Sequence, residues 1–153
     1  MEDSSQTAGG LRRELLATLA GIRDPQSRLQ WMVDRARHRP ALPEVDRREE
    51  HRVAGCQVRL WWVAEYRDGR CWFRSDSDAV TLKALTGLLA ECYSGEKPAE
   101  VVADPPSFLG ELGLLRQLAE SRRATVLRVA EGMVGFAREA MARDGVSMAG
   151  SAE

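Results

Sequence analysis

The stretch Val53-Ala54-Gly55-Cys56-Gln57-Val58-Arg59-Leu60-Trp61-Trp62 decides the fold, because the hydrophobic pattern of the chain changes its period here. Apolar residues occupy alternate positions from Val58 to Tyr66, which is typical of a strand with one face on a core. The glycine before Cys56 allows the backbone to bend. The stretch therefore predicts a bend that carries a cysteine, followed by a β-strand.

A tight hairpin turn follows this strand. Asp68-Gly69 suits a two-residue turn, because glycine accepts the positive φ angle that such turns need. Residues 70–74 then return as the partner strand. With a short strand before Gly55, we expect a small antiparallel meander of about three strands, and Cys56 lies at the bend that joins the first two.

Two helices are expected before the sheet. Apolar residues recur at helical spacing from Leu11 to Ile22. Asp24-Pro25 then gives an N-cap and first-turn signal for a second helix. Its inner face consists of Leu29, Met32, Val33 and Ala36. Pro40 and Pro43 end this helical hairpin and lead into an extended connector.

More helices follow the sheet. The first, residues 79–92, is apolar on most faces and is preceded by several possible N-caps. A short helical turn over 98–103 comes next, and Ser121 is the N-cap signal for a last helix. Its apolar side consists of Val126, Val129, Met133, Phe136 and Ala140. Gly132 and Gly135 weaken this helix unless close packing needs them.

The composition indicates one domain over 11–144, with disordered tails at 1–10 and 145–153. The chain has 153 residues, of which 44% are hydrophobic and 29% charged, and a net charge of -1. This charge gives no field that would attract nucleic acid or an anionic membrane. The chain has no signal-peptide pattern and no apolar run of membrane-spanning length, so we expect a cytoplasmic protein.

The three cysteines are the candidate chemical groups. Their odd number and wide spacing argue against a disulfide framework and a zinc site, and the chain carries no nucleotide-binding, metalloprotease or serine-hydrolase motif. Cys71 and Cys92 are interpreted as small core residues. Cys56 differs because it lies at a bend, where nearby cations favour the reactive thiolate. With two histidines in the chain, His38 and His51, a Cys-His hydrolase is disfavoured.

Several motifs resemble, in order and spacing, those of the SufE family of sulfur-acceptor proteins over about residues 11–136. These motifs are Leu42-Pro43, Asp46-Arg47, Gly55-Cys56-Gln57, Leu60-Trp61, Asp76-Ser77-Asp78-Ala79, Tyr93-Ser94-Gly95-Glu96-Lys97-Pro98-Ala99-Glu100, Leu112-Gly113-Leu114-Leu115 and Ser121-Arg122.

The resemblance implies an α+β fold with a three-stranded antiparallel sheet flanked by helices, similar to that of iron-sulfur scaffold proteins. It also implies that Cys56 accepts a sulfane sulfur from the persulfide of a PLP-dependent cysteine desulfurase, stimulates that enzyme, and passes the sulfur to an iron-sulfur assembly scaffold. Such a carrier needs no cofactor or metal of its own.

If Cys56 is the sulfur acceptor, we expect its neighbours to shape the bend and to shelter the persulfide. Gly55 and Gln57 shape and steady the bend. The Trp61-Trp62 pair, with Val58 and Leu60, forms an apolar recess that shelters a persulfide.

Four charged residues are candidates for docking the desulfurase: Arg59, Asp76, Asp78 and Arg122. Each also has a simpler interpretation, since the two aspartates can cap the following helix and the two arginines can meet solvent. The sequence departs from the family pattern at Val58, Arg59 and Arg123, which lie near this expected docking face.

Two other functions stay open at this point. The chain could regulate a desulfurase without carrying sulfur, or it could be an iron-sulfur scaffold that uses its three cysteines as ligands. The expected placement of those cysteines on a bend, a strand and a buried helix disfavours the scaffold.

Overall fold

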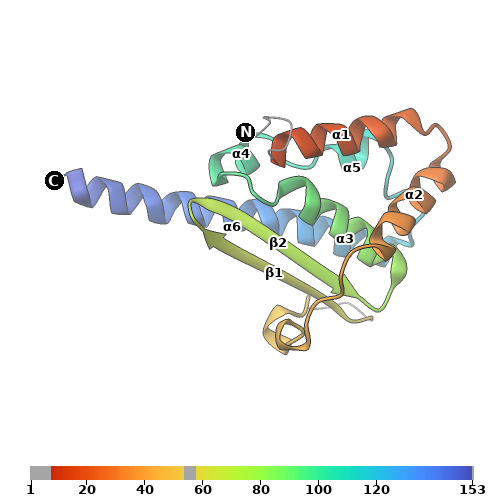
Figure 1. The fold of residues 1–153 in the computed structure, drawn as a ribbon, viewed down its shortest axis with the longest axis horizontal. Coiled ribbons are helices and arrows are strands. Elements are labelled where there is room, and N and C mark those ends of the chain that lie inside the picture. Colours follow the sequence, from red (N-terminus) through yellow and green to blue (C-terminus); the bar gives the residue numbers. More distant parts are fainter. Residues whose placement is uncertain (1–7, 54–57, 153) are drawn as a thin grey trace.

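The computed structural model describes residues 8–53 and 58–152 and has an α+β fold, as predicted. Figure 1 shows the helices gathered on one side of a β-hairpin, with α6 continuing past the hairpin turn. In chain order the elements are α1 (Ala8–Gly21), α2 (Pro25–Arg37), the 3-10 turns η2 (Glu44–Asp46) and η3 (Glu49–His51), β1 (Leu60–Arg67), β2 (Arg70–Ser77), α3 (Val80–Tyr93), α4 (Pro98–Ala103), α5 (Phe108–Glu111) and α6 (Glu120–Ala152).

The hairpin has the turn that the sequence predicts. β1 and β2 pair antiparallel from Leu60 opposite Ser77 to Arg67 opposite Arg70. Asp68 and Gly69 both take positive φ angles, 57° and 76°, which matches the right-handed twist of the two strands.

The third strand of the expected meander is shorter than predicted. Among the described residues it consists of one isolated bridge, between Arg52 and Trp61, supported by the Val53 N–H, which donates to the Leu60 carbonyl at 2.8 Å. The preceding residues turn into η3 and so leave the edge of β1. The sheet is therefore two-stranded, with a bridge where the first strand was expected.

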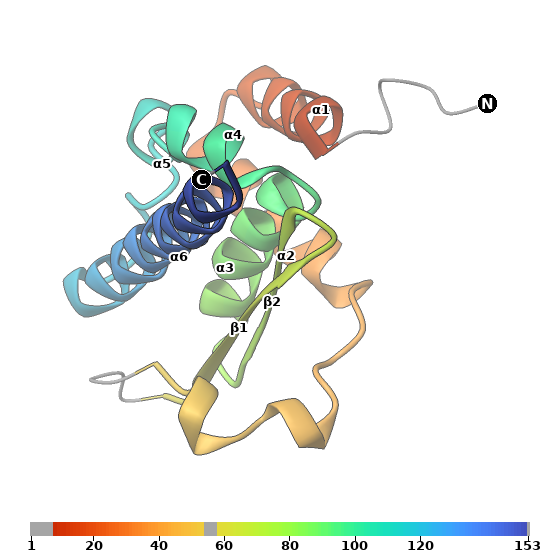
Figure 2. The ribbon, with the colours of Figure 1, turned by 90° about the vertical axis from the view of Figure 1, so that its left-hand side faces the viewer.

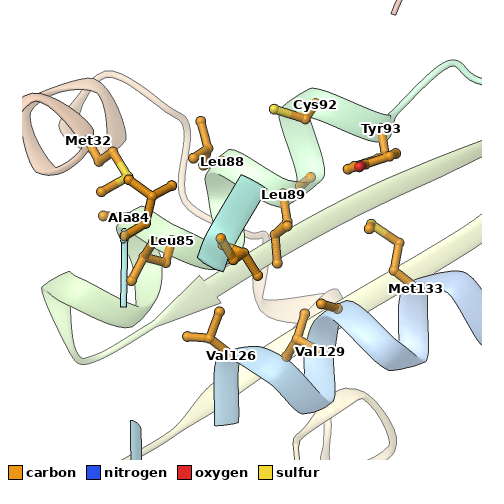
Figure 3. Packing of buried hydrophobic residues seen from close by; sticks show 14 of the residues in the cluster. Met32, Ala84, Leu85, Leu88, Leu89, Cys92, Tyr93, Val126, Val129 and Met133 are labelled. Atoms are coloured by element: carbon orange, nitrogen blue, oxygen red, sulfur yellow. The ribbon is translucent and has the colours of Figure 1, made fainter. Parts of the chain in front are cut away.

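Helix α3 is the centre of the core. It contacts β2, α2, α1 and α6, and Figure 2 shows it between the hairpin and the other helices. Its leucines are fully buried: Leu82, Leu85, Leu88 and Leu89. Figure 3 shows Leu85, Leu88 and Leu89 among Met32 of α2 and Val126, Val129 and Met133 of α6, which belong to the same core cluster. This burial is the main stabilising term of the fold.

The two faces of the hairpin pack differently. Leu60 and Phe73 point to the helices and join the main core. Trp61 and Val63 point to the opposite face, where Leu42 covers them in a second small cluster. Leu42 belongs to the connector, which we define as residues 38–52, between α2 and the bridge at Arg52. The connector is thus part of the packing around β1.

Several helix ends agree with the sequence and others differ. The Asp24 side chain caps α2 by accepting from the Ser27 N–H, as predicted, and α4 has the predicted bounds. Helix α6 begins at Glu120 rather than after Ser121. Helix α1 begins at Ala8, and the α6 backbone stays helical to Ala152, because no proline interrupts those segments. Both ends therefore extend into the stretches predicted to be disordered.

Within the described ranges, none of the helices combines the length and apolar character needed to cross a bilayer.

Replacing Gly132 or Gly135 with alanine is expected to stabilise the protein. A Cβ atom built at either position meets no heavy atom within 4 Å, so close packing requires neither glycine. Each substitution should raise the free energy of unfolding by about 0.5–1 kcal/mol, the helix-propensity difference between the two residues. Thermal or urea unfolding measures the change. Gly69→Ala is the contrasting control, since its φ of +76° strains any side chain; an equal gain there would contradict the explanation.

Candidate functional site

The stretch that carries Cys56 joins two firmly bonded positions. Gly55, Cys56 and Gln57 themselves lie outside the described residues. On the upstream side, the Val53 N–H donates to the Leu60 carbonyl at 2.8 Å. On the downstream side, the Arg59 carbonyl accepts from the Ser77 hydroxyl at 2.7 Å and the Asp78 N–H at 3.1 Å. Both ends of the stretch are therefore attached to the same end of the hairpin.

Trp61 lies beneath these attachment points. Its side chain is buried, at 4% exposure. The guanidinium carbons of Arg47 and Arg59 each lie 5.2 Å from the centre of its ring, within the range of favourable cation–π contact. Its backbone forms the bridge to Arg52. Trp61 thus contacts Arg47 and Arg52, which precede the Cys56 stretch, and Arg59, which follows it.

Asp76 is a buried hydrogen-bond acceptor and not an exposed docking group, since it is 2% exposed. Its carboxylate accepts from the Leu42 N–H at 3.0 Å, from Arg47 at 2.7 Å and from the Ser77 N–H at 2.8 Å. Lys83 lies 3.5 Å away. Asp76 therefore ties the connector to the end of β2.

The pKa of Asp76 reflects two opposed effects. Burial removes water and raises the pKa, whereas the hydrogen bonds from Leu42, Arg47 and Ser77 favour the ionised form and lower it. The hydrogen bonds outweigh burial, so the pKa lies below its ordinary value of 3.8. The carboxylate is ionised at neutral pH.

Neither aspartate caps α3, in contrast to the simpler interpretation of the sequence. Ala79 occupies the N-cap position and makes no side-chain cap. Its N–H donates to the Ser77 hydroxyl at 3.1 Å. The Asp76 carboxylate binds the Leu42 N–H and Arg47, and the Asp78 carboxylate pairs with Arg59. Neither carboxylate caps α3.

The structure brings the other three docking candidates to one end of the molecule. Arg59 Nε donates to Asp78 at 2.7 Å, and both side chains are exposed. Arg122, in the first turn of α6, donates to the Thr81 hydroxyl in the first turn of α3 at 3.2 Å. Asp78 lies just before that turn of α3. Exposed charges of both signs therefore surround the end of the hairpin from which the Cys56 stretch departs.

The expected recess walled by the Trp61-Trp62 pair is not formed. Trp61 lies in the small cluster with Leu42, whereas Trp62 stacks on Phe73, with ring centres 5.5 Å apart, and packs against the main core. Leu60 is fully buried there as well. Neighbouring side chains on a strand point to opposite faces, so these residues cannot wall one recess.

Cys71 and Cys92 are core residues, as predicted. Both are fully buried and unpaired. Burial is the main cause that raises the pKa of the Cys71 thiol to about 11 and that of the Cys92 thiol to about 12. At neutral pH both are protonated and shielded, and a protonated buried thiol is a poor nucleophile.

The histidines are engaged with backbone carbonyls. Nδ1 of His38 lies 2.9 Å from the Asp34 carbonyl and Nδ1 of His51 lies 2.8 Å from the Asp46 carbonyl. Because a carbonyl only accepts, each Nδ1 carries the proton. Within the described residues, no group of three or more histidine, cysteine or acidic side chains is arranged to hold a metal ion.

Two features near the connector were missed from the sequence. Arg35 and Arg39 both pair with Glu91, at 2.8 and 2.6 Å, and a cavity of about 540 Å³ lies between the connector, β2 and α3. Arg47 belongs to the Asp46-Arg47 motif, which by itself predicts no role for its side chain. Its pairing with Asp76 joins residues 29 positions apart, and no short-range spacing in the sequence signals it.

Comparisons with known proteins identify the family to which the sequence is similar. The SufE family profile, described as an Fe-S metabolism associated domain, matches residues 13–137. An uncharacterized SufE-like protein of Rhizobium meliloti is 27% identical over 120 residues, covering 75% of this chain and 85% of the relative. The sulfur acceptor protein CsdE of Escherichia coli is 27% identical over 126 residues, covering 80% and 84%.

A solved structure has a similar fold. It is the solution structure of a hypothetical protein from Thermus thermophilus, which has a TM-score of 0.69 and 25% sequence identity to this chain. The match covers 86% of this chain and 96% of that protein.

Proposed function

Since the chain belongs to the SufE family of Fe-S metabolism associated domains, we propose that it is a sulfur acceptor that takes a persulfide sulfur from a PLP-dependent cysteine desulfurase onto Cys56. The similarity to CsdE, a sulfur acceptor protein, supports this role. The scaffold of iron-sulfur cluster assembly is the proposed recipient of the sulfur, and the desulfurase is stimulated because its own cysteine is freed.

The observation that carries the choice of Cys56 is the state of the other two thiols. Cys71 and Cys92 are buried and have raised pKa values. Neither can approach a persulfide held on another protein without opening the core. Cys56 is the remaining cysteine, and it belongs to a stretch that is attached at both ends, through Val53 and Arg59, to the end of the hairpin where Leu60 and Ser77 pair.

The proposed step is an exchange at sulfur. The Cys56 thiolate attacks the outer sulfur of the desulfurase persulfide, a new S–S bond forms, and the old S–S bond breaks. The desulfurase cysteine leaves as a thiolate with the electron pair of the broken bond. No external oxidant or reductant is needed, because the sulfane sulfur moves without a net change of oxidation state.

Of the two other functions considered from the sequence, the regulator is separated by measurement and the scaffold is disfavoured by the positions of two cysteines. A regulator that carries no sulfur would dock without gaining mass. A scaffold would need its cysteines to converge, whereas Cys71 on β2 and Cys92 on α3 both lie within the core.

Intact-mass spectrometry tests the proposal. The protein is incubated with a candidate cysteine desulfurase, PLP and cysteine, and we expect the addition of one sulfur atom that is lost on reduction. Peptide mapping should place it on Cys56. Wild-type protein without cysteine substrate is the control. Absence of the added sulfur with each desulfurase of the same organism would contradict the carrier function.

A further inference from the structure

The cavity of about 540 Å³ between the connector, β2 and α3 has no part in the proposed sulfur transfer. We call it the connector cavity. Its walls are mostly apolar and include Leu11 of α1, Pro40 and Leu42 of the connector, Phe73 of β2 and Ala90 of α3. Small-molecule sites typically have volumes of about 300–1,000 Å³ and apolar walls with a few polar groups. The connector cavity has these properties.

The connector is fixed on both sides of this cavity. The Arg39 side chain pairs with Glu91 of α3 at 2.6 Å, and the Leu42 N–H donates to Asp76 of β2 at 3.0 Å. Pro40 lies between these two attachments, and its ring fixes the φ angle of the backbone. The connector therefore spans from α3 to β2 as a fixed wall, and the cavity is formed without a ligand.

A group with excess positive charge borders the cavity. Arg35 and Arg39 both pair with Glu91, at 2.8 and 2.6 Å. Burial raises the pKa of Glu91, but the hydrogen bonds and charges of the two arginines outweigh burial and hold this pKa below its ordinary value of 4.5. Glu91 is therefore ionised at neutral pH. Two positive charges and one negative charge give the group a net charge of +1.

Arg74 is the second cation among the described residues that line the cavity, and carboxylates already neutralise its charge. It pairs with Asp46 at 2.7 Å and lies 3.8 Å from Glu65. The excess positive charge at the cavity therefore belongs to the group around Arg39.

The guanidinium of Arg39 lies across Gly87 of α3. A Cβ atom built at Gly87 would collide with Arg39 Nη1, so glycine leaves room for this close approach. Within the described residues, the buried Nη2 of Arg39 makes no hydrogen bond, although it lies 2.6 Å from Glu91. Buried donors without a hydrogen-bonded acceptor are rare in proteins. Arg39 thus has donor capacity that the protein does not use.

We propose that the connector cavity binds a small organic anion, with its charged group at Arg39 and its hydrocarbon body between Leu42, Phe73 and Ala90. The net positive charge favours an anion, and a guanidinium is well suited to a carboxylate. The apolar walls favour a hydrocarbon body, because its burial removes apolar surface from water. The apolar residues enclose a hollow instead of forming a flat patch, which fits a small molecule better than a protein surface. This site is independent of the proposed sulfur transfer.

Titration of the full chain with octanoate, followed through the backbone amide NMR signals, tests the proposal. Octanamide has the same hydrocarbon body without the charge, and acetate has the charge without the body. We expect octanoate to shift the amide signals of Ala41, Gly87 and Ala90 until they saturate. Both controls should bind at least about tenfold more weakly. The proposal is overturned if octanoate gives no saturable shifts at these amides, or if either control binds as tightly.

Substitutions of the two lining arginines test the role of charge. Arg39→Gln should weaken octanoate binding by about tenfold and leave octanamide binding unchanged, whereas Arg39→Lys, which keeps the charge, should retain most of the affinity. Arg74→Gln is the matched control, since it removes a lining cation whose charge is already neutralised, and it should change octanoate binding by less than about twofold. Equal losses in Arg39→Gln and Arg74→Gln would contradict the proposal.

Two substitutions in α3 test the location without changing any charge. Ala90→Leu extends a side chain into the cavity and should abolish the binding of both octanoate and octanamide. Gly87→Ala suits a helix but displaces the guanidinium of Arg39, so it should weaken octanoate binding about as much as Arg39→Gln does. Wild-type affinity for octanoate in either folded variant would place the bound anion elsewhere and would overturn the proposal.

Discussion

Replacing Cys56 with serine is expected to abolish sulfur acceptance and to return the turnover of the partner desulfurase to its unstimulated value. Serine keeps the size and polarity of the site but supplies no thiolate to attack the persulfide. Since the chain around Cys56 is attached through backbone bonds and through Trp61, the substitution should leave the fold intact. The measurements are intact mass after incubation with desulfurase and cysteine, and sulfide release under reducing conditions.

Cys71→Ala provides the matched control for this substitution. Cys71 is fully buried and its thiol pKa is raised, so the variant should lose some stability through the lost packing and still accept sulfur. If Cys56→Ser retained stimulation while gaining no sulfur, the chain would act as a regulator instead of a carrier.

Asp76→Asn is expected to cause a large loss of stability for a single polar substitution, about 2 kcal/mol. The amide can still accept from the Leu42 N–H, but the charge that holds Arg47 and Lys83 is removed. Urea unfolding at neutral pH measures the loss. Asp78→Asn is the control, since its carboxylate is exposed and its ion pair is worth at most about 1 kcal/mol. Equal losses in the two variants would contradict the role assigned to Asp76.

The pH dependence of stability gives an independent test of Asp76. Its pKa in the folded protein lies below the ordinary value of 3.8. The stabilisation it provides is therefore complete above that value and is lost as the pH falls through the lower, folded pKa. Asp76→Asn should show a smaller loss of stability on acidification than the wild type. An unchanged acid profile would mean that Asp76 does not contribute in its ionised form.

Much of the architecture was predictable because its signals are local. Asp68-Gly69 favours a two-residue hairpin turn through the backbone angles that these residues accept, and the turn is confirmed. Asp24-Pro25 predicted the start of α2 for the same kind of reason. The leucines of α3 predicted a buried central helix, since a helix that is apolar on most faces is stable only when covered. The resemblance to the SufE family is also confirmed.

The environment of the candidate site was harder to predict, because it depends on contacts between distant residues. Alternation along β1 places Trp61 and Trp62 on opposite faces, and only the packing of Leu42 over Trp61 shows which face the connector covers. The sequence alone suggests that Asp76 caps a helix. In the folded protein the connector lies beside Asp76, and the carboxylate accepts hydrogen bonds from the Leu42 N–H and from Arg47.

The sequence by itself determined the hairpin, the main helices and the family, and it predicted Cys56 as the acceptor thiol. Each of these depends on backbone preferences, hydrophobic period or residue order, which are properties of neighbouring residues. The tertiary structure decided that Asp76 is buried, that Arg59 pairs with Asp78, and that Trp61 joins both arms of the Cys56 stretch. The contacts of Arg47 with Trp61, of Arg59 with Asp78 and of Leu42 with Asp76 join residues 14 to 34 positions apart, and their partners are selected by how the connector, the hairpin and α3 pack together.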